Sequence, residues 1–267
     1  MSANAIDPGT ALKIALWGAA GRMGGRIAAA IAAAPDLVLA VAAEHEDHPA
    51  IGNRVGEIAI VPGGDASLEE CGVVIDFSVP AAAVDVVARA ASADCAYVSG
   101  VTGLGEDQLA ALARAAATIA VLHAANMSRG IGLLTRLAAE AAGGLPGYDI
   151  EIVEMHHRRK RDAPSGTALQ LAAAIEQVRR GLRRIHGRSG VTGQRDAGEL
   201  GLHALRGGDV VGEHRVIFAG PGERLVLTHH AESREAFVAG VLAAVRFVVE
   251  QPAGRYTMSD VLGLTAS

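Results

Sequence analysis

The chain has 267 residues, 50% of them hydrophobic and 20% charged, so it can bury a full core in one or two domains and is too apolar to be disordered. Its net charge of −5 disfavours nucleic-acid binding, because proteins of that class are usually basic. We find no uncharged apolar stretch of about 18 residues, and we therefore expect no membrane span. Met1–Thr10 lacks the pattern of a secretory signal, and Cys71 and Cys95 have neither metal-binding nor disulfide spacing. We therefore expect a cytoplasmic protein without a metal site.

The first part of the chain has the pattern of a β-α-β unit. Residues 12–17 are a short apolar run typical of a buried strand, and a glycine turn follows. An alanine-rich helix is expected over 22–34, where Pro35 ends it. A second strand is expected over 37–43.

The same alternation continues to about residue 122. Strands are expected over 73–77, 96–99 and 119–122, and helices over 80–91 and 106–117. Continuous apolar strands that alternate with helices predict a parallel sheet covered on both faces. This half is therefore an α/β domain of the dinucleotide-binding type.

The pattern changes near residue 130. We expect helices over 130–142, 167–179 and 233–250, and strands over 148–155, 202–206, 214–219 and 224–230. The last three strands are linked by glycine-rich turns without helices, which predicts an antiparallel or mixed sheet in a second, α+β domain. The basic, glycine-containing stretch 179–198 is expected to be a mobile loop.

The glycine turn between the first strand and the first helix has the pattern of a phosphate-binding loop. Glycines 18, 21 and 24 are spaced GxxGxxG rather than GxGxxG, but the turn opens a helix whose N-terminus favours an anion. Glu44 follows at the end of the next strand, where a carboxylate can accept both ribose hydroxyls of an adenosine. The alternative is a plain helix-capping turn. For residues 44–48 we favour a solvated loop over a metal cluster.

The segment 154–167 carries the densest functional pattern. Adjacent His156 and His157 precede four consecutive cations, which suit an anionic small molecule. Lys160 stands among arginines in a chain with only one other lysine, which indicates a need for a titratable ammonium. The start of the next helix offers backbone N–H groups and hydroxyls to a carboxylate. The alternative is a solvated basic loop. For the pair His229–His230 we favour a structural role.

These motifs resemble those of the dihydrodipicolinate reductase family, over nearly the whole chain and in order. The matching segments are Gly18–Gly24, Gly100–Gly103, Ala124–Met127, Glu154–Thr167, Gly212–His214 and Asp260–Leu262. The resemblance implies a Rossmann-like nucleotide-binding domain over 1–130 and 241–267, and a substrate-binding and tetramerisation domain over 131–240. It also implies a homotetramer that takes NADH or NADPH and a cyclic dicarboxylate substrate.

The resemblance implies a role for each site residue. Residues implied to contact the cofactor phosphates are Gly18, Ala19, Ala20, Gly21, Arg22 and Met23, those beside the adenosine ribose are Glu44 and His45, and those on the nicotinamide side are Gly100, Val101, Thr102, Ala124, Ala125, Asn126 and Met127. Residues implied to transfer protons are His156 and Lys160, and those implied to bind substrate are His157, Ser165, Gly166 and Thr167. The implied reaction is hydride transfer to ring C4 of dihydrodipicolinate, in diaminopimelate and lysine biosynthesis.

Three positions depart from the family pattern. Val101 stands where many relatives have Thr, Met127 where they often have Phe, and His45 where relatives that accept NADPH often have Arg. Because Glu44 would repel a 2′-phosphate, we expect NADH to be used at least as well as NADPH. Two alternatives remain open at this point, another dehydrogenase on the same scaffold and a nicotinamide-sensing regulator without turnover.

Overall fold

The chain forms two compact units in the computed structural model, which describes residues 11–264. The first unit runs to Met127 and includes Phe237–Gly263, and the second comprises Ser128–Ala236 with Leu264. The boundaries expected from the sequence were 130/131 and 240/241. Residues 1–10 and 265–267 of the expected division lie outside the described residues. The same holds for Met1–Thr10, where we expected no secretory signal.

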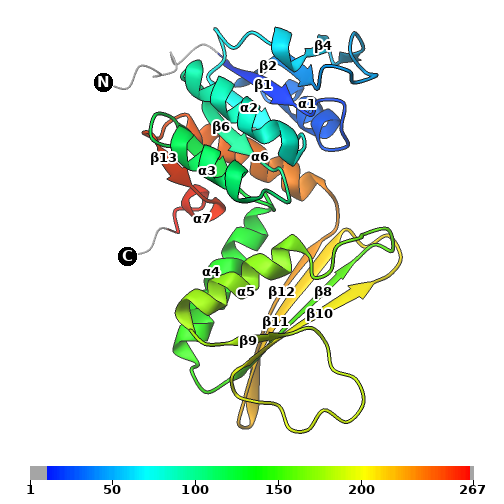
Figure 1. The fold of residues 1–267 in the computed structure, drawn as a ribbon, viewed down its shortest axis with the longest axis vertical. Helices are drawn as coiled ribbons and strands as arrows, with labels where there is room; N and C mark the ends of the chain where they lie inside the picture. Colours follow the sequence, from blue (N-terminus) through cyan, green and yellow to red (C-terminus); the bar gives the residue numbers. More distant parts are fainter. Residues whose placement is uncertain (1–10, 265–267) are drawn as a thin grey trace. The chain divides into compact units, whose positions relative to one another are not determined.

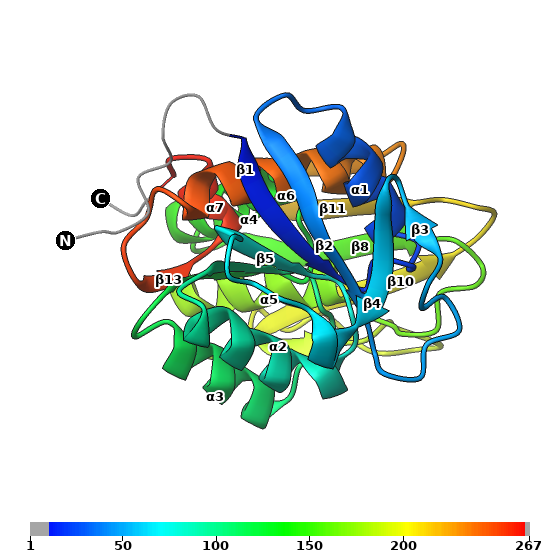
Figure 2. The ribbon, with the colours of Figure 1, turned by 90° about the horizontal axis from the view of Figure 1, so that it is seen from above.

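The first unit is built on an eight-stranded sheet, shown in Figures 1 and 2. Its strands, in the order in which they pair, are β13 (Gly254–Tyr256), β7 (Ala120–His123), β6 (Ala96–Ser99), β5 (Val73–Asp76), β1 (Leu12–Trp17), β2 (Leu37–Glu44), β4 (Ile58–Pro62) and β3 (Arg54–Val55). All pairs are parallel except β3 with β4. The expected parallel sheet is confirmed, whereas β3, β4 and β13 are strands that the sequence did not predict.

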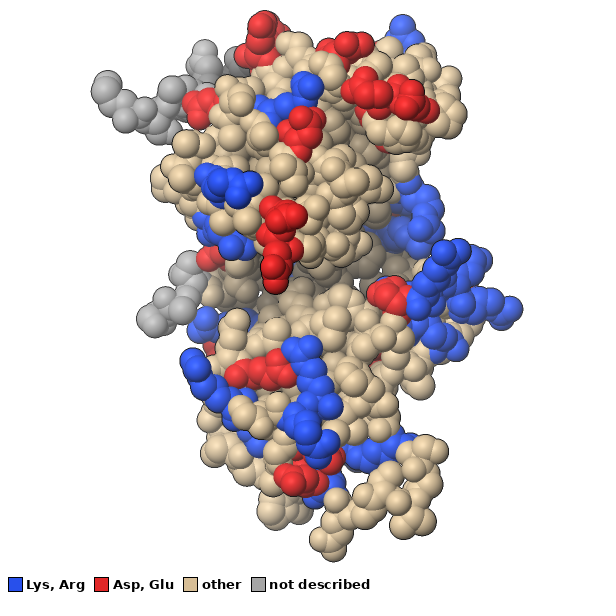
Figure 3. Space-filling model, in the orientation of Figure 1, with Lys and Arg blue, Asp and Glu red and all other residues tan. Residues whose placement is uncertain are grey.

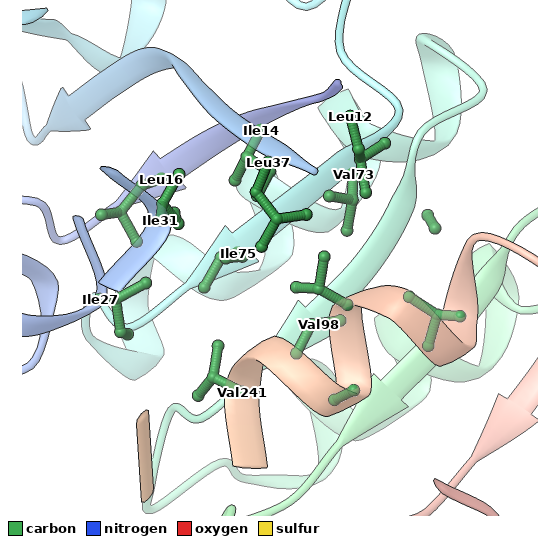
Figure 4. Packing of buried hydrophobic residues seen from close by; sticks show 14 of the residues in the cluster. Leu12, Ile14, Leu16, Ile27, Ile31, Leu37, Val73, Ile75, Val98 and Val241 are labelled. Atoms are coloured by element: carbon green, nitrogen blue, oxygen red, sulfur yellow. The ribbon is translucent and has the colours of Figure 1, made fainter. Parts of the chain in front are cut away.

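Helices cover both faces of this sheet (Figure 2). One face packs on α1 (Gly24–Ala32) and α6 (Glu235–Val248), and Figure 4 shows apolar side chains of both helices, such as Ile27 and Val241, near those of the strands. The other face packs on α2 (Pro80–Ser92) and α3 (Glu106–Ala115). A 3₁₀ turn (Gly63–Asp65) and the short helix α7 (Met258–Val261) complete the unit.

Helix α1 begins at Gly24 rather than at the expected residue 22. A Cβ atom on Gly24 would lie 2.1 Å from the carbonyl oxygen of Gly18, so only glycine permits this close approach of helix and turn. The turn itself therefore extends through Met23. This geometry places the start of α1 directly behind the end of β1.

The second unit is a five-stranded mixed sheet with two helices on one face (Figure 1). Its strands, in pairing order, are β12 (Glu223–Ala231), β11 (Gly212–Gly220), β8 (Asp149–His156), β10 (Glu199–Arg206) and β9 (Arg183–Ile185). Strand β8 pairs parallel with β10 and antiparallel with β11, which confirms the expected mixed sheet. The helices are α4 (Arg129–Gly144) and α5 (Gly166–Val178).

The stretch 179–198, expected to be a mobile loop, is anchored to this sheet. It contains strand β9, which pairs with β10. Two of its arginines, Arg188 and Arg195, form ion pairs with Glu151 of β8 at 3.0 and 2.9 Å. The expected loop is therefore interrupted by a strand over 183–185, whose partner lies far away in the sequence, while residues 186–198 contain no helix or strand.

Candidate active site

The segments expected to bind a dinucleotide meet at one edge of the first sheet. Strand β1 has β2 on one side and β5 on the other, so the chain changes direction across the sheet at β1. The segments that follow β1, β2, β6 and β7 all leave the carboxyl ends of parallel strands, which lie on the same edge. Ligands of open α/β sheets bind at such a switch point.

The glycine turn leaves the start of α1 open to an anion. Gly18 has a φ of +75°, which side chains disfavour, and Ala20, Gly21 and Arg22 are exposed. Helix α1 has no side-chain cap and no acidic residue in its first turn. Backbone N–H groups at an uncapped helix N-terminus are suited to a pyrophosphate.

Glu44 is tied directly to this turn. The residue is 8% exposed, and its Oε1 accepts a hydrogen bond from the N–H of Ala20 at 2.9 Å. Two side chains of the loop after Glu44 accept hydrogen bonds from backbone N–H groups. The Oε1 of Glu46 accepts the N–H of Gly64 at 2.7 Å, and Nδ1 of His48 accepts the N–H of Ala50 at 3.1 Å. Over residues 11–264, no group of three metal-ligating side chains is found.

The two remaining segments of this edge pack closely on their neighbours. A Cβ on Gly100 would lie 2.3 Å from the ring of Phe77, so Gly100 allows the ring to approach its backbone. Val101 is buried, and its carbonyl oxygen lies 2.9 Å from Nε2 of His123. The side chain of Met127 lies in the hydrophobic core of the first unit. The sequence reasoning missed His123, which occupies the last position of β7.

Glu154 organises the candidate site of the second unit. It lies on β8, is 1% exposed, and forms two hydrogen bonds with the guanidinium of Arg206, at 2.8 and 2.9 Å. Its Oε1 also accepts the N–H of Ser165 at 3.0 Å. Burial alone would raise the pKa of Glu154, but hydrogen bonds from His156 and Arg206 lower it to about 2. The group is therefore a carboxylate at neutral pH.

That carboxylate orients His156. The Nδ1 atom of His156 lies 2.6 Å from Oε2 of Glu154, and a carboxylate only accepts hydrogen bonds. Nδ1 therefore carries the hydrogen, and in the neutral ring Nε2 is the basic nitrogen. A Cβ on Gly212 would lie 3.2 Å from this Nε2, so glycine there keeps its surroundings uncrowded.

His214 is a further histidine of this site that the sequence reasoning did not single out. It is 2% exposed, and its ring meets that of His156 edge to face at 5.2 Å. Its Nε2 lies 3.2 Å from Oγ of Ser165, and its Nδ1 is buried without a partner among the described residues. Burial and the nearby His156 lower the pKa of His214 to about 3, so the ring is neutral. Its presence in the motif Gly212–His214 was the available signal.

Lys160 and His157 lie on the loop that follows β8. The ammonium of Lys160 is 2.8 Å from a carboxylate oxygen of Asp162, and the backbone oxygen of Asp162 accepts from Arg206 at 2.6 Å. Burial and the nearby Arg159 lower the pKa of His157. Figure 3 shows Lys and Arg side chains gathering at this end of the second unit, where Arg158, Arg159 and Arg161 are exposed.

The start of α5 differs from expectation at one residue. Ser165 is buried, and its hydroxyl accepts the N–H of Ala168 at 3.2 Å as the helix N-cap. Its polar atoms thus serve Glu154, His214 and the helix. Gly166 is exposed at the first helical position, followed by the buried Thr167. The helix therefore offers its N-terminal turn to an anion mainly at Gly166.

His229 fits the structural role expected for it. Its Nε2 lies 3.2 Å from Oγ of Ser128, the N-cap of α4, and a Cβ on Gly130 would lie 2.7 Å from its ring. His230 lies 3.4 Å from Glu213.

No helix among residues 11–264 has the length and apolar content needed to cross a membrane.

Family models and relatives with known names match this chain over most of its length. Residues 12–127 match the family model for the N-terminus of dihydrodipicolinate reductase, and residues 130–262 match the model for its C-terminus. A 4-hydroxy-tetrahydrodipicolinate reductase of Halorhodospira halophila is 44% identical over 95% of this chain and 99% of its own. One from Methanocaldococcus jannaschii is 44% identical over 95% and 98%.

Two solved structures are also similar. Dipicolinate-bound dihydrodipicolinate reductase from Paenisporosarcina sp. TG-14 has a TM-score of 0.75 at 25% identity, and the match covers 93% of this chain and 98% of that one. A myo-inositol dehydrogenase from Corynebacterium glutamicum has a TM-score of 0.56 at 16% identity, with 96% and 94% covered. The second likeness concerns the fold alone.

Proposed function

The chain belongs to the dihydrodipicolinate reductase family, and we propose that His156 and Lys160 serve its reaction, the nicotinamide-dependent reduction of 4-hydroxy-tetrahydrodipicolinate in diaminopimelate and lysine biosynthesis. The observation that carries the residue assignment is the 2.6 Å hydrogen bond from His156 to the buried carboxylate of Glu154. It orients an imidazole in the same segment that holds Lys160 and the start of α5.

The substrate is a ring with two carboxylates, and the second unit offers matching groups. The N-terminal turn of α5, at Gly166 and Thr167, suits one carboxylate. The cationic loop after β8, with His157 at its start, suits the other. The dipicolinate bound by the Paenisporosarcina protein has the same two carboxylates, which supports this class of ligand. Ser165 contributes by fixing the helix start, because its hydroxyl accepts the N–H of Ala168, rather than by contacting the substrate.

Loss of the 4-hydroxyl group as water converts the substrate to dihydrodipicolinate, and the nicotinamide cofactor would supply, when bound, the hydride for C4 of that ring. The carbon next to C4 must then gain a proton. Lys160 can donate one from its ammonium, whose Nζ lies 2.8 Å from a carboxylate oxygen of Asp162. His156 can relay a proton through Nε2, because Nδ1 is committed to Glu154. Arginine in place of Lys160 would not release a proton near neutral pH.

The first unit fits the cofactor. Residues Gly18–Met23 and the uncapped start of α1 would hold the phosphates, and Glu44 would hold the adenosine ribose. The segments Gly100–Thr102 and Ala124–Met127, which follow β6 and β7, would lie on the nicotinamide side. Glu44 disfavours a 2′-phosphate by charge repulsion, and the residue beside it, the exposed His45, is not an arginine. NADH is therefore used at least as well as NADPH.

We also infer a homotetramer that acts in the cytoplasm. The face of the second sheet opposite α4 and α5 exposes Leu205 (50%) and Val226 (39%), which suits burial against another subunit. Both cysteines are free thiols, as in a reducing compartment. Mass measurement by light scattering tests the assembly, because Val226→Glu should then give smaller species.

A coupled assay tests the activity. The substrate is generated in place from pyruvate and aspartate semialdehyde by the matching synthase, and nicotinamide absorbance is followed with NADH and NADPH in parallel. Oxidation that depends on the synthase is the expected result. A folded protein that binds NADH but oxidises neither cofactor would overturn the proposal.

A further inference from the structure

A buried carboxylate, Asp76, connects the ends of neighbouring strands of the first sheet. It ends β5, and its Oδ2 accepts a hydrogen bond from the hydroxyl of Tyr97 on β6 at 2.6 Å. Its Oδ1 accepts both the N–H and the hydroxyl of Ser78, at 2.9 and 2.5 Å. Burial of a carboxylate is costly unless donors surround it, so these contacts lock the loop after β5 to β6.

His123 makes the corresponding connection between β7 and the loop after β6. Its Nε2 lies 2.9 Å from the carbonyl oxygen of Val101, and because a carbonyl only accepts, Nε2 carries a hydrogen. Burial lowers the pKa of His123, which favours the neutral ring. Two backbone hydrogen bonds extend the sheet pairing into the same loops. The N–H of Gly100 donates to the carbonyl oxygen of Asp76 at 2.9 Å, and the N–H of Ala124 donates to that of Ser99 at 3.0 Å.

These side chains lie on the side of β1 opposite Glu44. A dinucleotide crosses the switch point of such a sheet, so an adenosine at Glu44 directs the nicotinamide half toward the loops after β5, β6 and β7. We propose that Asp76, Tyr97 and His123 are positioning residues for the nicotinamide half of the cofactor, acting through the Ser78 and Val101 loops. This inference rests on the proposed function only for the identity of the cofactor.

The test compares two ligands of the full-length protein. NADH contains the nicotinamide, whereas ADP-ribose lacks it and keeps the adenosine and both phosphates. His123→Leu removes the N–H that donates to the carbonyl oxygen of Val101. It should weaken NADH binding roughly three- to tenfold, which corresponds to the loss of one hydrogen bond. ADP-ribose binding should change by less than about twofold. His123→Gln restores an N–H at similar reach and should recover most of the NADH affinity.

A second pair of variants removes a single oxygen each. Tyr97→Phe deletes the hydroxyl on Asp76 and should weaken NADH selectively, even if His123→Leu does not fold. Tyr256→Phe is the control, because its hydroxyl bonds only the backbone of Pro252 among the contacts described for it, away from these loops. Equal loss of NADH and ADP-ribose affinity, or no loss of either, would overturn the inference. A wild-type protein that binds NADH without turnover would contradict the reductase mechanism and leave this comparison intact.

Discussion

The Nδ1 atom of His156 and the Oε2 atom of Glu154 are 2.6 Å apart, inside a sheet where Glu154 is 1% exposed. The same carboxylate accepts both arms of Arg206 and the N–H of Ser165. One buried group thus contacts both the imidazole and the residue that caps α5. The loss of its charge should affect catalysis more than ligand binding.

Glu154→Gln should lower kcat by about tenfold or more, because an amide places N–H donors against Arg206, Ser165 or His156 and misorients the ring. Inhibition by pyridine-2,6-dicarboxylate should persist. Steady-state kinetics with this inhibitor measure both effects. Glu140→Gln, at an exposed pair with Arg136, is the matched control. An unchanged kcat in a folded Glu154→Gln variant contradicts the orienting role.

Lys160→Ala should reduce kcat by a factor of about 100 or more, as expected for lost proton transfer, while NADH binding survives. Lys160→Arg should fail similarly, because a guanidinium does not release its proton near neutral pH. Lys13, the other lysine, pairs with Glu70 on the first unit, so Lys13→Ala is the control. Turnover that persists in both Lys160 variants rejects Lys160 as the donor.

His45→Arg should shift cofactor preference toward NADPH. A guanidinium next to Glu44 would offset the repulsion between that carboxylate and a 2′-phosphate. The ratio of kcat/KM for NADPH to that for NADH measures the shift. For the unaltered protein, a ratio several-fold above one would contradict the NADH prediction. No change on substitution would mean that other residues contact the 2′ position.

Stability should fall in acid because of Glu151. Burial alone would raise its pKa, but hydrogen bonds from Arg188, His203 and Arg195 lower it from 4.5 to about 2. A carboxyl whose pKa is lower in the folded than in the unfolded state stabilises the folded protein. This contribution is fully present above pH 4.5 and is lost as the pH falls toward 2. The contribution is at most about 3 kcal/mol at neutral pH.

Denaturant unfolding between pH 7 and 3 measures this contribution. Glu151→Gln should be less stable than the unaltered protein at pH 7 and should lose less stability on acidification. Glu140→Gln should follow the unaltered protein, because its side chain is exposed. Parallel pH curves for the unaltered protein and Glu151→Gln would show that Glu151 contributes nothing to acid sensitivity.

Some parts of this structure follow from neighbouring residues in the sequence. The strand over 12–17, the glycine turn and the strand that ends at Glu44 were predicted from local patterns, and the structure contains each of them. The stretch 179–198 could not be predicted in this way. Its strand pairs with β10, and its arginines form ion pairs with Glu151. These partners lie outside the stretch, so its own residue pattern does not predict them.

The same distinction applies to the candidate site. The sequence by itself identified the family, the two-domain architecture and the segments 18–24 and 154–167, because these depend on residue type and short spacing. Only the tertiary structure identified Arg206 and His214 beside His156, and Asp76 with Tyr97 on the first sheet. Hydrogen bonds between strands join residues that are tens of positions apart, so their geometry exists only once the sheets have formed.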